Sequence, residues 1–231
     1  MKRFYKAVTV AAGEQGHRIL LDGKPVRTPA RTVLEVPTAG LAQAIAEEWA
    51  AQESDVRPER MPLTRLAATM LDRAGNQRAG FVDEIVAYLG NDLLCYRAEA
   101  PVDLVARQRS VWDPWLAWAR ERHGIDLAPA EGILHRPQPE ASLAAGRRAV
   151  EALDAGPLTA LHLLTTALGS AVLALAVVEG ALDAETGFEA AHLEEIFQVE
   201  KWGEDREAAR RRRDIRDDVL ATARFVALLR H

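Results

Sequence analysis

The chain divides near residue 100 into a part with both strand-like and helical patterns of apolar residues and a part whose spacing is helical, and this division limits the folds open to it. Before residue 40 the apolar residues alternate or form short runs, as in KAVTVAA and HRILL, which is typical of β-strands. Asp22-Gly23 separates two such runs and indicates a tight hairpin. After Pro101 the spacing is helical almost to the end. We therefore predict an α+β fold, with a small N-terminal domain (1–100) of antiparallel β-sheet and helices, followed by an all-helical C-terminal domain (101–231).

Local signals place the individual elements. Thr38 is a good N-cap for a helix in which Leu41, Ile45 and Trp49 recur every four residues. Further helices are predicted at about 64–72, 81–89, 139–154, 158–179, 186–201 and 205–230. The short apolar run DLLCYR (92–97) predicts a strand that returns to the first sheet, and Pro114 is expected to kink or divide its helix.

One apolar segment, residues 158–178, is long enough to be tested as a membrane span, because it has 21 residues without a formal charge. It contains His162 and several hydroxyl side chains, and no cluster of lysine or arginine lies close to either end. We interpret the segment as a central helix buried on all sides, and we predict no membrane partner.

Charge limits the partners of the chain. A net charge of −5 argues against a general affinity for polyanions. Four adjacent arginines, 210–213, lie within residues 199–218, but that stretch holds seven acids and seven bases. Arginines neutralised by acids three or four residues away on the same helix leave little field for phosphates, so we predict no nucleic-acid partner.

A search for catalytic motifs finds none in the sequence. There is no glycine-rich phosphate loop and no G-x-S-x-G element, and the six histidines are scattered along the chain. The single cysteine, Cys95, excludes an internal disulfide. We therefore expect no cofactor, no metal site and no catalytic residue. The alternative is a hydrolase with an acid–base pair at Glu204 and Asp205.

The segment VEKWGEDRE (199–207) is the best functional candidate. Trp202-Gly203 is expected to end one helix and Glu204-Asp205 to begin the next, which a simple pair of helix caps explains. The acids of this segment exceed what one cap requires, and beside an apolar ring they suit recognition of a basic, partly apolar protein surface. The candidate partner-binding residues are Glu200, Trp202, Glu204, Asp205 and Glu207. We also expect Trp202→Ala to cost about 3–5 kcal/mol in core packing.

Several motifs, in order along the chain, carry a resemblance to a known family. They are LDGKPVRTP at 21–29, EEWAAQ at 47–52, MPLT at 61–64, WDPWLAW at 112–118 and FQVEKWGEDRE at 197–207. Together they resemble the ATP synthase assembly chaperones that act on the alpha subunit of the soluble catalytic sector, and the likeness extends over nearly the whole chain.

The resemblance implies a protein without known enzymatic activity that binds the free alpha subunit and leaves when the catalytic hexamer forms. The family's functional positions fall here on Gln198, Glu200, Trp202, Gly203, Glu204, Asp205 and Glu207. The family motif begins at residue 3, without the presequence of mitochondrial members. Either the protein is bacterial or the sequence lacks a leading segment, and the alanine- and arginine-rich composition favours the first. We expect a cytoplasmic monomer, with eukaryotic relatives in the mitochondrial matrix.

Overall fold

The computed structural model describes residues 1–75, 77–132 and 134–230. The chain forms two compact units. Unit 1 comprises Met1–Arg78, Asp154–Ala160 and Ala221–His231, and unit 2 comprises Ala79–Leu153 and Leu161–Leu220. The boundary expected near residue 100 falls inside unit 2. The division into domains at 1–100 and 101–231 stays a prediction.

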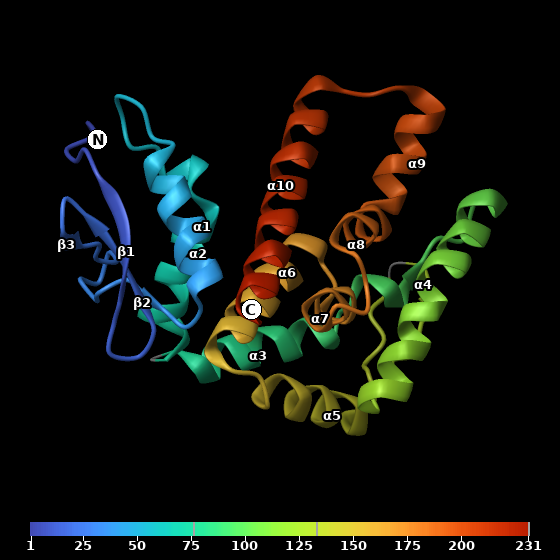
Figure 1. The fold of residues 1–231 in the computed structure, drawn as a ribbon. Coiled ribbons are helices and arrows are strands. Elements are labelled where there is room, and N and C mark those ends of the chain that lie inside the picture. Colours follow the sequence, from blue (N-terminus) through green and yellow to red (C-terminus); the bar gives the residue numbers. More distant parts are fainter. Residues whose placement is uncertain (76, 133, 231) are drawn as a thin grey trace. The chain divides into compact units, whose positions relative to one another are not determined.

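Unit 1 contains the antiparallel sheet that the alternating pattern predicted. Its strands are β1 (Val8–Ala12), β2 (His17–Leu21), β3 (Lys24–Pro25) and β4 (Glu35–Val36). Strand β2 is central and pairs antiparallel with the other three (Figure 1). Asp22 and Gly23 both have positive φ, 48° and 76°, as the tight turn between β2 and β3 requires. The predicted hairpin is therefore confirmed.

One helix packs on this sheet, and a second helix packs on the first. Helix α1 (Ala39–Ala50) packs on β1 and β2, and α2 (Pro62–Thr69) packs on α1 (Figure 1). A 3-10 turn, η1 (Pro58–Arg60), precedes α2, and a π-helical turn, η2 (Met70–Ala74), follows it. Thr38 caps α1 as predicted, because its side chain accepts a hydrogen bond from the Leu41 amide.

Unit 2 is built mainly from helices. Its helices are α3 (Arg78–Leu89), α4 (Val102–His123), α5 (Glu140–Glu151), α7 (Ala171–Glu179), α8 (Ala184–Ala191) and α9 (Leu193–Trp202). Helices α6 (Ala155–Leu168) and α10 (Arg206–Leu228) have residues in both units. Within unit 2, α4 packs on α5, α7 and α9, and α8 packs on α7 and α9. The α+β fold class predicted from the sequence is confirmed.

The run at 92–97 does not return to the first sheet, so that prediction is wrong. Residues Leu93–Cys95 form a 3-10 turn, η3, whose first residue follows the capping side chain of Asp92. Strand β5 (Tyr96–Arg97) then pairs in parallel with β6 (Ala130–Glu131), in a separate two-stranded sheet. The cap at Asp92 begins a turn where the apolar pattern alone indicated an extended strand.

Pro114 does not divide its helix, because α4 runs without interruption from Val102 to His123. Both Pro114 and Ser110, whose carbonyl loses its helical partner, lie on the exposed face of α4. Water can satisfy the freed carbonyl there, which lowers the cost of an internal proline.

Two other helices are shorter than predicted. The apolar stretch at 158–179 is broken at Gly169, where φ is +64°, and Ser170 then caps α7 by accepting from the Leu173 amide. The stretch at 186–201 is divided at His192 into α8 and α9. Every residue from Ala171 to Val178 is buried. In the described ranges, no helix combines the length and the apolar character that crossing a membrane requires.

Candidate functional site

The joint between α9 and α10 (residues 198–207, the α9–α10 joint below) has the cap structure that the sequence predicted. Helix α9 ends at Trp202, and Gly203 has φ +87° and ψ 173°, a backbone conformation essentially restricted to glycine. Asp205 begins α10, because its Oδ1 accepts hydrogen bonds from the amides of Glu207 (3.0 Å) and Ala208 (2.9 Å). The conformation of Gly203 and the Asp205 cap therefore define the backbone between the end of α9 and the start of α10.

Trp202 is a surface residue, with 78% of its area exposed to solvent. The expectation that it packs in the core, and that Trp202→Ala would cost 3–5 kcal/mol, is therefore wrong. A tryptophan at the last position of a helix, next to a glycine without a side chain, has few neighbours to pack against. An exposed side chain of this size is typical of a residue that contacts another molecule.

The acids of the joint are less free than the sequence suggested. Glu200 accepts a hydrogen bond from Arg107 of α4 at 2.7 Å, and this bond lowers the pKa of Glu200. Glu204 is paired with Arg212 of α10. Asp205 is occupied as the cap, whereas Glu207 is exposed in the first turn of α10.

Three of the arginines that follow the joint are paired with acids of neighbouring helices. Arg211 and Arg212 lie 3.6 and 3.8 Å from Glu195 of α9, and Arg216 lies 2.6 Å from Glu185 of α8. The neutralisation expected from acids along the same helix therefore comes mainly from neighbouring helices. Basic side chains paired in this way are poor ligands for a phosphate backbone.

Helix α4 supplies residues that sequence analysis did not single out. Lys201 lies 2.9 Å from Asp103 of α4, and this contact lowers the pKa of Asp103. Together with the pair of Arg107 and Glu200, it joins the start of α4 to the end of α9. Val102, the first residue of α4, is 85% exposed. We call Val102, Asp103, Arg107, Glu200, Lys201 and Trp202 the α4–α9 surface.

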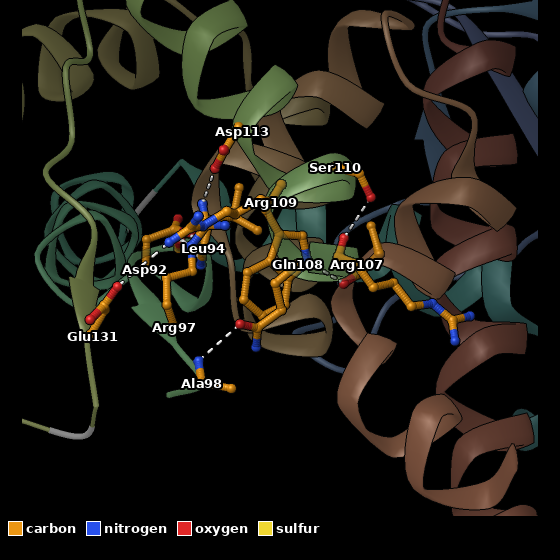
Figure 2. Close-up of polar contacts among 12 residues, drawn as sticks. Asp92, Leu94, Arg97, Ala98, Arg107, Gln108, Arg109, Ser110, Asp113 and Glu131 are labelled. Atoms are coloured by element: carbon orange, nitrogen blue, oxygen red, sulfur yellow. Dashed lines mark hydrogen bonds and ion pairs between the residues drawn. The ribbon is translucent and has the colours of Figure 1, made fainter. Parts of the chain in front are cut away.

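A buried polar network holds α4 in place beneath this surface (Figure 2). Gln108 is fully buried, accepts from the Ala98 amide at 2.9 Å and donates to Glu194 of α9 at 2.6 Å. The indole N–H of Trp112 donates to the Ala190 carbonyl of α8 at 2.8 Å. Because these buried groups are costly to leave unpaired, they fix α4 against α8 and α9.

The joint and the α4–α9 surface expose apolar and charged groups side by side. An exposed indole and an exposed valine stand beside carboxylates that already bond to arginines or to backbone amides. Among residues 1–75, 77–132 and 134–230, no three histidine, cysteine, aspartate or glutamate side chains lie close enough together to hold a metal ion.

Comparison with known proteins identifies the family. The sequence model of the family described as ATP12 chaperone protein matches residues 2–120, about half of the chain. The chain belongs to the ATP12 chaperone family. The α9–α10 joint lies outside the residues matched by that family model, but the structural relatives below cover it.

Three members or relatives extend the comparison. The protein atp12, mitochondrial, of Schizosaccharomyces pombe is 23% identical over 214 residues, which are 87% of this chain and 74% of that protein. The crystal structure of Atp12 from Paracoccus denitrificans shares 38% identity and a TM-score of 0.93, covering 99% of this chain and 98% of that one. The Atu1473 protein of Agrobacterium tumefaciens is 42% identical, with a TM-score of 0.92 and coverage of 99% and 86%.

Proposed function

We propose that this protein is an assembly chaperone of ATP synthase that holds the free alpha subunit of the catalytic sector until the subunit meets its neighbour in the ring. Membership of the ATP12 chaperone family supports the chaperone role. The proposed site rests on one observation: Trp202 is 78% exposed at the end of α9.

The physical need for such a chaperone follows from ring assembly. Subunits of an obligate ring bury large apolar interfaces against each other, and a free subunit exposes them. Exposed apolar patches of that size cause aggregation. A protein that covers one interface, with an affinity low enough for the true neighbour to displace it, prevents the aggregation.

In this proposal the α4–α9 surface and the α9–α10 joint contact the alpha subunit. Trp202 fills an apolar depression on the subunit, because tryptophan gives the largest contact area of any side chain at low entropic cost. Glu204, Asp205 and Glu207 face basic groups that the beta subunit would later engage. Because Glu204 and Asp205 already have intramolecular partners, they mainly orient the contact, and Trp202 supplies most of the affinity.

The proposal includes a monomeric, cytoplasmic protein without catalytic activity. The alternative, a hydrolase with Glu204 and Asp205 as acid and base, finds little support at the joint, because both carboxylates are exposed and already bonded. A general acid instead needs an environment that shifts its pKa toward neutrality. Ester or nucleotide turnover by the purified protein that Glu204→Gln abolishes would favour the alternative.

The test of the proposed partner is capture from a native lysate. The tagged chain, incubated with lysate and analysed by mass spectrometry, should retain the alpha subunit in preference to the beta subunit. Retention of other proteins without the alpha subunit would refute the proposed partner.

Charge reversal then tests the joint. Glu204→Lys and Asp205→Lys should each weaken capture of the alpha subunit, because both place a cation against basic groups. Glu140→Lys is the matched control, since Glu140 lies in the first turn of α5. If all three variants capture equally well, the acids of the joint serve only as caps.

A further inference from the structure

A small pocket lies beside the two-stranded sheet of unit 2, away from the α9–α10 joint in sequence. Its volume is about 230 Å³, which admits a group the size of a carboxylate with a few attached carbons. It is lined by Arg97, Arg109, Asp113, Pro129, Ala130 and Glu131. Figure 2 labels the four charged residues of this set. Two arginines and two acidic residues therefore line the same pocket.

Arg97 is held rigidly at this pocket. Its Nε donates to the Leu94 carbonyl at 2.9 Å and its Nη2 to Asp113 Oδ1 at 2.7 Å. Its guanidinium carbon lies 5.2 Å from the centre of the Trp112 ring. Only 8% of the residue is exposed. Two hydrogen bonds and an aromatic face thus fix the plane of the guanidinium before any ligand arrives.

One group of this guanidinium is unsatisfied. Nη1 of Arg97 is buried and has no hydrogen-bond partner among the residues that the structure describes. A buried donor without an acceptor is costly, and the cost is higher for a charged group. Arg97 is one of the residues that line the pocket, and an unpaired cationic N–H on such a residue is the feature expected where a ligand oxygen completes the bonding.

The second arginine is loosely held and can turn toward a ligand. Arg109 and Glu131 are 3.6 Å apart, and their side chains are largely exposed. Exposed pairs of this kind contribute little, and solvent screens them. Glu131 therefore competes only weakly for Arg109, and an incoming anion can take the place of Glu131.

We infer that this pocket binds a carboxylate group, with one oxygen on Nη1 of Arg97 and the other on the guanidinium of Arg109. The charge of the lining decides the class of anion. Asp113 and Glu131 balance the two arginines, so a monoanion adds one negative charge, whereas inorganic phosphate, which is partly a dianion at neutral pH, adds more than one. A planar carboxylate also matches the geometry of guanidinium donors. The carboxylate comes from an acidic side chain of a bound peptide or from a small free acid.

The experiment measures binding to the full chain alone, so its outcome is independent of the alpha subunit. Propionate, phosphate and chloride are titrated at constant ionic strength while the Arg97 Nε–H signal is followed by NMR. We expect a saturable shift with propionate and none with chloride, and weaker binding of phosphate than of propionate. An acetylated tetrapeptide with one glutamate, beside its glutamine counterpart, distinguishes a peptide side chain from a free acid.

Two substitutions should move the affinity in opposite directions. Arg109→Gln should weaken propionate binding by roughly tenfold, because one charged hydrogen bond is lost. Glu131→Gln should strengthen it by roughly two- to fivefold, because the competitor for Arg109 is removed. Arg120→Gln, the same change on the same helix beyond the pocket, should leave the affinity unchanged.

Arg97→Lys adds a further check, since lysine keeps the charge but loses the planar donor pair. It should abolish binding, and the melting temperature of each variant shows whether the fold is intact. The inference is overturned if propionate gives no saturable shift, which would mean that water alone serves Nη1. It is also overturned if Arg109→Gln and Arg120→Gln bind equally, or if phosphate binds more tightly than propionate.

Discussion

Asp92 and Asp205 both cap the start of a helical segment, but one is buried and the other is exposed. Each accepts hydrogen bonds from the amides at the start of a helical segment. Asp92 is fully buried, and it also accepts from the Ser170 hydroxyl at 2.7 Å and the Val172 amide at 3.1 Å, at the start of α7. Asp205 is exposed and serves α10 alone.

The difference separates a residue that maintains the fold from residues that we propose contact a partner. Burial raises the pKa of Asp92 to about 6 although a hydroxyl and several backbone amides donate to it, so removal from water outweighs the hydrogen bonds. The carboxylate therefore joins η3 to α7 at an electrostatic cost. At the α9–α10 joint the carboxylates stay in water, beside an exposed indole, and their replacement disturbs little of the structure.

The largest expected effect is that of Asp92→Ala. The substitution leaves the Leu94 and Val172 amides and the Ser170 hydroxyl without their acceptor inside the protein. We expect a loss of about 2–4 kcal/mol in the free energy of unfolding. Urea denaturation followed by circular dichroism measures it. A loss no larger than that of Asp205→Ala would remove the distinction between the two caps.

The second prediction concerns pH. The folded-state pKa of Asp92, about 6, exceeds the usual value for aspartate in an unfolded chain, about 4. Its contribution to stability is thus fully present below pH ~4 and is lost as pH rises through ~6. Relative to Asp92→Asn, the wild-type chain should lose on the order of 2–3 kcal/mol between pH 4 and pH 7. Denaturation curves at several pH values measure this difference, and a difference that is constant or grows with pH would contradict it.

The exposed cap should matter less. Asp205→Ala removes the acceptor from two amides at the start of α10, but water can replace it there. We expect a cost of about 1 kcal/mol. The same urea experiment measures it, with Asp205→Asn as a control that keeps a capping oxygen and should recover most of the loss.

The smallest effect is expected at Glu200. Glu200→Gln breaks the pair with Arg107, which is about half exposed on both sides. The free energy of unfolding should fall only slightly, and less still at high salt, because solvent and ions screen such pairs. Unfolding at low and high salt tests this, and a loss as large as that of Asp92→Ala would mean that the pair is structural.

What the sequence predicted correctly depends on neighbours along the chain. The turn at Asp22-Gly23, the cap at Thr38 and the joint at Gly203 each follow from a few adjacent residues. The break of the apolar helix at Gly169 was missed, because alanine, leucine and valine continue on both sides and hide a single glycine. The DLLCYR run was misplaced, since β5 pairs with residues that lie more than 30 positions later.

The site shows the same limit. The joint itself was predictable because Glu200, Trp202 and Asp205 are close in sequence. Arg107 was missed, since 93 residues separate it from Glu200 and only the fold brings them together. The exposure of Trp202 also required the structure, because the apolar pattern of a helix does not reveal where its last residue points.

The central claim is that Trp202 is available to a partner and not part of the core. Its most direct test is the affinity of Trp202→Ala for the purified alpha subunit, measured by titration beside the melting temperature. We predict an unchanged melting temperature and an affinity lower by roughly thirtyfold or more, as at a binding hot spot. Phe4→Ala, which truncates an exposed aromatic side chain of unit 1, should leave the affinity unchanged. A Trp202→Ala variant that melts several degrees lower, or that binds the alpha subunit as tightly as the wild-type chain, would contradict the account.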